Sequence, residues 1–428
     1  MKSILSLVII LLIFSTTVFA QKDLGDGWKL IGQIQLRSEV DGRDFSNETH
    51  PLTFTSLRTR FGVEKSFEDR LLLYIQLQDS RVFGSETSTL SNSKNVDLHQ
   101  GYLTLNKLFD WDWTIQGGRF EVSYGTQRFF GSVGWNFIGR SFDGVRFGIA
   151  PDNFDVDLFA LTVRESVTYI GNAIPARYPY PQEPTPSSSI YGFWKKTKFD
   201  DNIKLQLFGY WEINRYKTGG DTCILNMPTL GGSYWGNFGG ISTIVEAAYQ
   251  FGEFIGKDIS AYLVSVSAYY NVGITKVGIG ADILSGTNPD DAATKMNTFQ
   301  ATYGTNHKFY GYMDYFINIP LNTMNLGLND FYFTSEFIPE DSKWNFGANI
   351  HQFMSNKSTD ITLPGNSSAT SENAFGQEVD LTVKYAFVKG TTLVWGGSVF
   401  FPGGLMKYAF APRDDIAYWS YLMIVANL

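Results

Sequence analysis

Long segments in which apolar and polar residues alternate constrain this chain more than any other feature. Between residues 203 and 214, Leu205 and Leu207 fall on one face, while Lys204 and Gln206 fall on the other. The same alternation recurs in segments 57–64, 344–351 and 379–387. Because side chains of a β-strand alternate between two faces, one face of each segment meets an apolar medium and the other can meet water.

The length of these segments separates two all-β architectures. A soluble β-sandwich also alternates, but these strands run for about 10–13 residues, whereas strands of soluble proteins usually have ~5–6. Long tilted strands with an apolar band and aromatic girdles are typical of outer-membrane barrels. The apolar faces here carry Trp113, Trp211, Trp344, Trp395 and Trp419. No stretch of about 18 apolar residues follows residue 20, so the sequence predicts an all-β fold: a transmembrane antiparallel β-barrel with an aqueous lumen.

The alternating segments can be counted. The expected strands are 30–39, 53–65, 70–80, 96–105, 113–122, 142–150, 154–164, 190–199, 203–215, 239–251, 259–271, 275–285, 308–317, 327–337, 343–353, 376–387, 391–401 and 416–427. A barrel of about 18 strands has the even number found in single-chain bacterial barrels and leaves an aqueous channel. Residues 226–235 could form another strand, and the alternation of short and long connections breaks around 271–308.

The first twenty residues predict export. Lys2 precedes an apolar core at 4–14, and the small residues Val18 and Ala20 precede Gln21 as in a signal-peptide cleavage site. This core is too short for a spanning helix, which needs ~20 residues. We therefore expect a signal peptide over 1–20 and an outer-membrane β-barrel over 21–428, located in the bacterial outer membrane.

Composition excludes several other classes of protein. The formal net charge is -8, which argues against a nucleic-acid partner. Aromatic residues make up 16% of the chain and charged residues 18%, which is the opposite of a disordered composition. The single cysteine, Cys223, excludes an internal disulfide framework and any zinc site built from several thiolates.

Seven sequence blocks resemble the alginate export porin family. They are LRTR (57–60), DLHQGYL (97–103), GRFEVSYG (118–125), RSFDGVR (140–146), NHKFYGYMD (306–314), GLND (327–330) and GQEVDL (376–381). Their order and spacing extend the resemblance over most of the mature chain. The resemblance implies an outer-membrane channel of about 18 strands whose Arg-rich lumen passes an anionic polysaccharide by diffusion. It does not imply which solute this chain carries, because fold alone does not fix function.

Arginine is concentrated in the first part of the chain. Arg58 and Arg60 are two residues apart and share one strand face, opposite Leu57 and Thr59. A charge facing lipid at mid-membrane costs ~2–4 kcal/mol, so such faces should line the lumen. The candidate pore-lining, anion-binding residues are Arg37, Arg58, Arg60, Arg119, Arg128, Arg140 and Arg146. Their candidate charge partners are Glu39, Glu64, Asp97, Glu121 and Asp143.

These charges have two interpretations. Guanidinium groups stay charged and present a fork to carboxylates, so a ring of them selects for anions. Alternatively, each arginine pairs with a nearby carboxylate and merely keeps the lumen wall solvated and neutral.

Little else in the sequence indicates chemistry. The histidines are His50, His99, His307 and His351, without HExxH spacing. We expect no catalytic residues, no cofactor, no metal site and no enzymatic activity. A barrel-embedded hydrolase using His99 or His351 is a remaining alternative, as is a weak cation site at His99 and Asp97.

The sequence thus favours a porin of the alginate-export type that passes an anionic polysaccharide or another anionic solute. The first alternative is a general or nutrient-specific uptake porin, and another is a barrel that only anchors an envelope complex. The expected partners are outer-membrane lipid, the anionic polysaccharide or small anion, and periplasmic export or assembly proteins.

Overall fold

The computed structural model describes residues 21–85, 95–151, 154–164, 188–214, 224–363 and 366–428. The strands are β1 (Gln21–Gly25), β2 (Trp28–Gly42), β3 (Leu52–Phe67), β4 (Leu71–Val82), β5 (Asp97–Leu105), β6 (Trp113–Phe120), β7 (Phe142–Ile149), β8 (Phe154–Arg164), β9 (Ser188–Lys198), β10 (Ile203–Asn214), β11 (Leu225–Phe238), β12 (Ile241–Phe254), β13 (Lys257–Val272), β14 (Thr275–Leu284), β15 (Leu328–Phe337), β16 (Trp344–Ile361), β17 (Thr370–Val388), β18 (Thr391–Pro402) and β19 (Ala417–Asn427). The helices are α1 (Ile319–Asn322) and α2 (Gly404–Ala409), with 3₁₀ turns η1 (Leu108–Asp110), η2 (Pro289–Asp291) and η3 (Asn306–Lys308). Among the described residues, every helix is too short or too polar to cross a bilayer.

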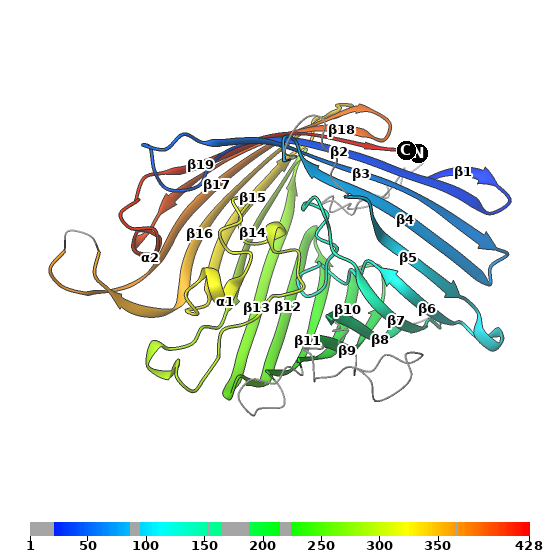
Figure 1. The fold of residues 1–428 in the computed structure, drawn as a ribbon, viewed down its shortest axis with the longest axis horizontal. Helices are drawn as coiled ribbons and strands as arrows, with labels where there is room; N and C mark the ends of the chain where they lie inside the picture. The colour runs from blue at the N-terminus through cyan, green and yellow to red at the C-terminus, as the bar shows by residue number, and fades with distance from the viewer. Residues whose placement is uncertain (1–20, 86–94, 152–153, 165–187, 215–223, 364–365) are drawn as a thin grey trace, which may run out of the picture.

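The strands form one closed antiparallel barrel (Figure 1). Each strand from β2 to β18 pairs with the next, and β19 pairs back with β2 from Tyr418↔Gly42 to Asn427↔Gln33, which closes a ring of 18 strands. The short β1 folds back on β2 by a tight hairpin and pairs Gln21 with Ile31. Closure satisfies every strand edge within the ring, as an apolar surrounding requires.

The two ends of the barrel differ in their connections. At one end, here the short-turn end, strands are joined by turns such as 239–240 and 389–390. Gly239 and Gly240 supply φ angles of 58° and 85°, which a side chain would disfavour. At the opposite end, the long-loop end, connections include 43–51, 121–141 and 285–327. This asymmetry is typical of outer-membrane barrels.

Strand β10 shows how sequence alternation becomes two chemically different faces. Leu207 and Trp211 are 46% and 39% exposed on the outside of the ring, whereas Phe208, Tyr210 and Glu212 between and beside them are buried. The register predicted for this strand is therefore confirmed. Trp419 was expected on the outer, apolar face, and this prediction is wrong. Its side chain is 2% exposed, and its Nε1 donates a hydrogen bond to Glu39 at 3.0 Å on the lumen side.

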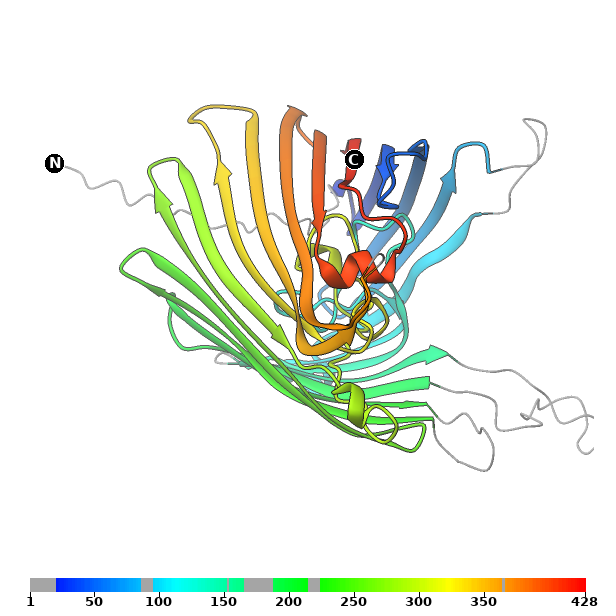
Figure 2. The same cartoon turned by 90° about the vertical axis from the view of Figure 1, so that its left-hand side faces the viewer.

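The lumen is largely filled by two loops from the long-loop end, 121–141 and 285–327. In Figure 2 their cyan and yellow traces lie inside the ring of strands. Their aromatic side chains are buried inside the barrel, including Phe129, Phe130, Tyr303, Tyr310 and Phe316. The core of this protein therefore lies between loops and wall, while the outer face of the wall stays apolar.

The predicted number of strands is right, but two assignments are wrong. Residues 226–235 belong to β11, which spans Leu225–Phe238, whereas 308–317 lie within the lumen loop 285–327 and form no strand. Inserting β11 puts the turn at 273–274 at the short-turn end and loop 285–327 at the long-loop end, and the exception becomes the two-residue connection 255–256 at the long-loop end. The expected signal peptide at 1–20 lies outside the described residues.

Candidate functional site

Arg128 anchors the first lumen loop to the C-terminal wall. Its Nη1 donates to Asp282 Oδ2 at 2.7 Å, its Nε donates to Glu246 Oε2 at 2.9 Å, and its Nη2 donates to Ser265 at 3.0 Å. Burial opposes its charge, but Asp282, Tyr310 and Glu246 outweigh that effect, so the pKa of Arg128 lies well above its ordinary value. The side chain lines the lumen but is enclosed by two carboxylates, and its binding of a solute anion stays a prediction.

Arg58 lies on the lumen face of β3 but is covered by the same loop. Its Nη2 donates to Gln33 at 2.8 Å and to Gln35 at 2.6 Å, and its Nη1 donates to the carbonyls of Gly134 and Asn136 at 3.1 and 2.7 Å. Within the described part of the chain, no carboxylate forms an ion pair with Arg58. The guanidinium is therefore held by neutral oxygens.

Arg60 and Arg37 flank Arg58 and are covered in the same way. Arg60 donates to Glu121 at 3.2 Å and to the carbonyl of Ile138 at 3.2 Å. Arg37 donates to Glu39 at 2.7 Å and lies 3.9 Å over the ring of Trp135. Arg37, Arg58 and Arg60 are 6%, 0% and 1% exposed. They face the lumen, but segment 134–138 covers them, so their contact with a solute stays a prediction that this arrangement does not favour.

The two remaining lumen arginines, Arg140 and Arg146, are both half-buried. Arg140 donates to the carbonyl of Gly304 at 3.1 Å and so joins the two lumen loops. Burial lowers the pKa of Arg140 to about 10. Arg146, on the lumen face of β7, keeps a side chain 32% exposed, and its Nη1 lies 3.8 Å from Asp157. Among the seven predicted arginines, Arg140 and Arg146 are therefore the half-buried ones on the lumen side.

Arg119 and Asp143 lie on the wrong side of the wall for the predicted role. They are paired residues on β6 and β7 and share a face with Val145, which is 51% exposed on the outside. Arg119 Nη2 and Asp143 Oδ2 are 2.7 Å apart. The prediction that Arg119 and Asp143 line the lumen is wrong. The ion pair faces outward, because side chains alternate along a strand and the adjacent residues Phe120 and Phe142 face the lumen.

The predicted charge partners are only partly matched to arginines. Glu39 pairs with Arg37 and Glu121 with Arg60, as described above. Glu64 instead pairs with Lys29 at 2.7 Å. Asp97 is exposed at the end of β5, where it accepts a hydrogen bond from the amide of Leu98 at 2.7 Å. The expectation of an arginine partner is therefore wrong for Glu64, while Asp97 has none among the described residues.

His99 forms a constellation that bears on the hydrolase alternative. Its Nε2 lies 2.8 Å from Glu121, and its Nδ1 lies 3.2 Å from the hydroxyl of Ser141. The Ser141 hydroxyl, however, donates to the carbonyl of His99 at 2.6 Å, and Glu121 also binds Arg60. With its proton committed to a carbonyl, Ser141 is not poised as a nucleophile. These contacts fix loop 121–141 against β5.

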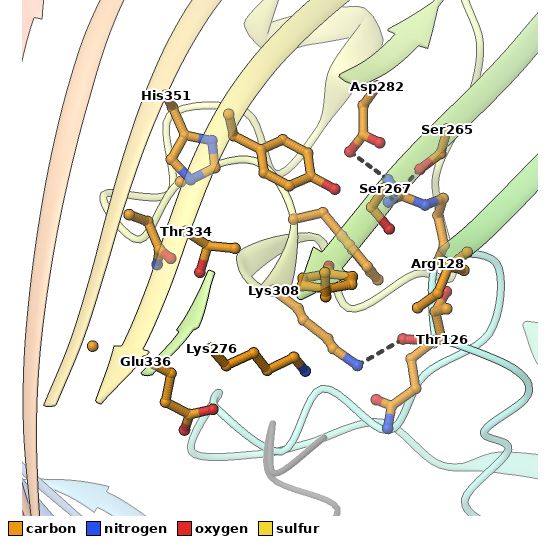
Figure 3. Close-up of a pocket in the computed structure, with 18 of the residues that line it drawn as sticks. Thr126, Arg128, Ser265, Ser267, Lys276, Asp282, Lys308, Thr334, Glu336 and His351 are labelled. Carbon is orange, nitrogen blue, oxygen red and sulfur yellow. Dashed lines mark hydrogen bonds and ion pairs between the residues drawn. The ribbon is translucent and has the colours of Figure 1, made fainter. Parts of the chain in front are cut away.

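An open cavity of about 260 Å³ lies between the lumen loops and strands β11 to β17. Its charged lining groups are Arg128, Lys276, Lys308, Lys384, Glu246, Asp282 and Glu336 (Figure 3). Lys276 and Lys384 come from the short-turn ends of β14 and β17, so the cavity extends from mid-barrel towards that end. Lys308, from the second loop, donates to the carbonyl of Thr126 at 2.9 Å, and burial lowers its pKa to about 8.

These three lysines were missed by sequence reasoning, although part of the signal was present. Lys384 alternates with outward-facing Val383, and Lys276 alternates with Val277, so both could have been placed on the lumen face. Lys308 fell in a segment predicted to be a strand. Its position inside the lumen depends on how loop 285–327 folds back.

Acidic side chains line the wall behind the second loop. His351 Nδ1 lies 2.9 Å from Asp330 Oδ2, and its Nε2 lies 3.9 Å from Asp380. Glu378 accepts a hydrogen bond from the amide of Met313 at 2.8 Å. These groups are buried, so they hold the loop rather than present negative charge to the cavity. In the described ranges, no group of three or more His, Cys, Asp or Glu residues is arranged to hold a metal ion.

A closed ring of long antiparallel strands, apolar outside and polar inside, with loops folded into the lumen, defines an outer-membrane porin. Residues 29–411 match the family described as alginate export, and the chain belongs to that family. The protein is therefore a porin of the bacterial outer membrane. No curated protein matches the sequence.

Solved structures share the fold at low sequence identity. OpdQ of Pseudomonas aeruginosa is 12% identical with a TM-score of 0.57, and the alignment covers 94% of this chain and 97% of OpdQ. OccK10 (OpdN) of the same organism is 10% identical with a TM-score of 0.58, covering 94% and 99%. OccAB1 of Acinetobacter baumannii is 11% identical with a TM-score of 0.56, covering 93% and 96%. At these identities the likeness concerns the fold alone.

Proposed function

We propose that this porin passes anionic solutes by passive diffusion, and that an anionic polysaccharide of the alginate type is among them. The proposal rests on family membership for the class of solute and on the charge of the open cavity for its sign. It requires no covalent chemistry, because a channel lets solute move down its own gradient.

The observation that best supports this proposal is the arrangement of charge around the cavity. Arg128, Lys276, Lys308 and Lys384 supply four cations against three carboxylates. Two of those carboxylates, Glu246 and Asp282, are buried and bound to Arg128. Solute therefore meets three ammonium groups and one carboxylate, Glu336, whose Oε1 accepts a hydrogen bond from Asn345 at 2.7 Å. Such a lining raises the local concentration of anions.

The lining also suits a sugar ring. Tyr269, Tyr332 and Phe309 line the same cavity as the lysines. Flat aromatic faces pack against the apolar C–H surfaces of a ring, while ammonium groups contact its carboxylate. A uronate unit combines both features.

A nutrient-specific uptake porin for small anions is the second candidate. It is favoured by the two loops that fill the lumen, because Phe130 and Tyr303 stack inside the barrel at 5.8 Å between ring centroids. A lumen narrowed in this way suits a small solute better than a long polymer. Both candidates need the same cationic lining.

Current block in a planar bilayer tests the proposal. Oligouronates of increasing length should interrupt the single-channel current, and neutral oligosaccharides of equal length should do so much less. Block by the monomer alone would assign the channel to small anions. Equal block by neutral and anionic sugars would refute the role of the lysines.

A further inference from the structure

The outside of this barrel carries ion pairs where a lipid-facing wall should be apolar. Arg119 and Asp143 pair across β6 and β7. On β4, Arg81 Nε donates to Asp79 Oδ1 at 2.7 Å. Arg81 and Asp79 face outward with Leu77 and Ile75, which are 44% and 52% exposed. Both pairs therefore lie on one side of the barrel, on β4 and on β6 with β7, with only β5 between them.

The Arg119–Asp143 pair is not at the rim of the apolar band. Trp113 begins β6, and Arg119 follows it by six residues on the same face of the strand. A tilted strand rises about 2.5 Å per residue along the barrel axis, so the pair stands at most about 15 Å above the girdle, inside a band ~25 Å tall. A lipid tail would leave these charges without a polar surrounding, which is costly.

Polar and small side chains extend this region into a patch. Outward positions near the pairs include Gly101 on β5 and Gly117 on β6, directly opposite Arg119 and Val145. Towards β2, the hydroxyls of Ser38 and Thr55 hydrogen-bond on the outer face at 2.9 Å. A shallow groove over β3 and β4 is lined by Leu57, Thr59, Asp79, Arg81, Phe83 and Gly84. On the opposite side, the outer face shows apolar side chains such as Leu207 and Val266, and polar contacts there, such as Tyr249 with Ser260 at 2.8 Å, are uncharged.

We propose that this patch, over the outer faces of β2 to β7, is the contact surface for a second copy of this chain. Its charges are these two ion pairs, and Lys65 on β3 and Asp97 at the start of β5 add one charge of each sign, so the patch is neutral and carries both signs. A two-fold axis through such a patch brings Arg119 of one copy towards Asp143 of the other, as an isologous interface requires. Glycines at the centre let two walls approach closely. The phosphates of a lipid headgroup would instead select a surface with excess positive charge.

Cross-linking in the outer membrane tests the contact. In a Cys223→Ser background, Gly117→Cys places a thiol at the centre of the patch, where a side-chain carbon meets nothing within 4 Å. A short bis-maleimide should link two copies and give a band at twice the monomer mass. Leu207→Cys, exposed on the far wall, is the matched control and should stay monomeric.

A second variant separates an interface from a lipid-facing wall. The double substitution Arg119→Leu with Asp143→Leu removes both charges without leaving one unpaired. If the patch joins two copies, native mass spectrometry from mild detergent should show a dimer for the wild type and loss of at least tenfold in dimer population for the variant. A monomeric wild type with no Gly117→Cys cross-link would overturn the proposal. So would a monomer that holds lipopolysaccharide and loses it on the double substitution.

Discussion

Arg128 and Asp282 are 154 residues apart in the sequence, yet their side chains meet at 2.7 Å inside the barrel. This contact ties loop 121–141 to β14, and Glu246 on β12 completes it from the other side at 2.9 Å. The pair fixes loop 121–141 beside the lysine-lined cavity, because Arg128 and Thr126 line that cavity together with the lysines.

Removing Arg128 should destabilise the barrel strongly. Arg128→Met would leave two buried carboxylates without a cation, which costs about 3–5 kcal/mol for a buried pair. The exposed pair of Arg413 and Asp44, at 3.2 Å, is the matched control, and Arg413→Met should cost ~0–1 kcal/mol. Urea unfolding in detergent measures both. Equal losses in the two variants would show that the Arg128 cluster does not support the structure.

Arg58 should act on the size of the open channel rather than on its selectivity. It donates two hydrogen bonds to loop carbonyls at 134 and 136, so Arg58→Gln should loosen the loop and raise single-channel conductance. Arg81→Gln, which changes a charge on the outer face of the neighbouring strand, should leave conductance unchanged. A changed ion preference without a change of conductance would mean that solute does reach Arg58.

The two faces of β10 should respond oppositely to a new charge. Leu207 faces outward, so Leu207→Arg should impair assembly at a cost of ~2–4 kcal/mol near the bilayer midplane. Gln206 faces the lumen and accepts a hydrogen bond from Trp194 at 2.6 Å, so Gln206→Arg should cost only about 1 kcal/mol for that lost bond. Heat modifiability on gels and urea unfolding compare them. A more severe defect in Gln206→Arg would reverse the assigned register.

Anion preference should weaken between pH 7 and pH 9. Burial lowers the pKa of Lys308 to about 8, so its ammonium is mostly charged at pH 7 and mostly neutral at pH 9. The cavity therefore loses positive charge as pH rises through that value. Reversal potentials recorded across this range check it. Lys308→Gln should abolish the pH dependence, and a variant that keeps the full dependence would assign it to another group.

The fold was largely predictable because each wall strand has one face in lipid and one in the lumen. Leu207 and Gln206 show this alternation directly. Strand β11 was harder to recognise because Pro228 and Gly231 lower strand propensity, but a side-chain carbon on Gly231 would collide with the Phe208 ring. Segment 308–317 was mistaken for a strand because it is rich in aromatic residues, which favour strands, although they pack on loop and wall rather than on lipid.

The site was less predictable because it depends on loops that fold back over the wall. Strand parity places Arg58 and Arg60 in the lumen, but nothing in their spacing shows that the carbonyls of Gly134 and Ile138 cover them. The rule that charged side chains avoid lipid also failed at Arg119, because its place in the strand alternation puts its side chain on the outer face. A rule about single side chains cannot anticipate a charge neutralised by its neighbour on the next strand.

The reversal potential of the wild-type channel in a potassium chloride gradient tests the central claim most directly. Lys276, Lys308 and Lys384 should give a potential of anion-selective sign, larger at low salt because screening extends only ~10 Å at 0.1 M. Changing all three to Gln should move the potential towards cation preference, whereas Lys65→Gln on the outer face should not. A cation-selective wild type, or an unchanged potential in the folded triple variant, would contradict an anion channel built on this cavity.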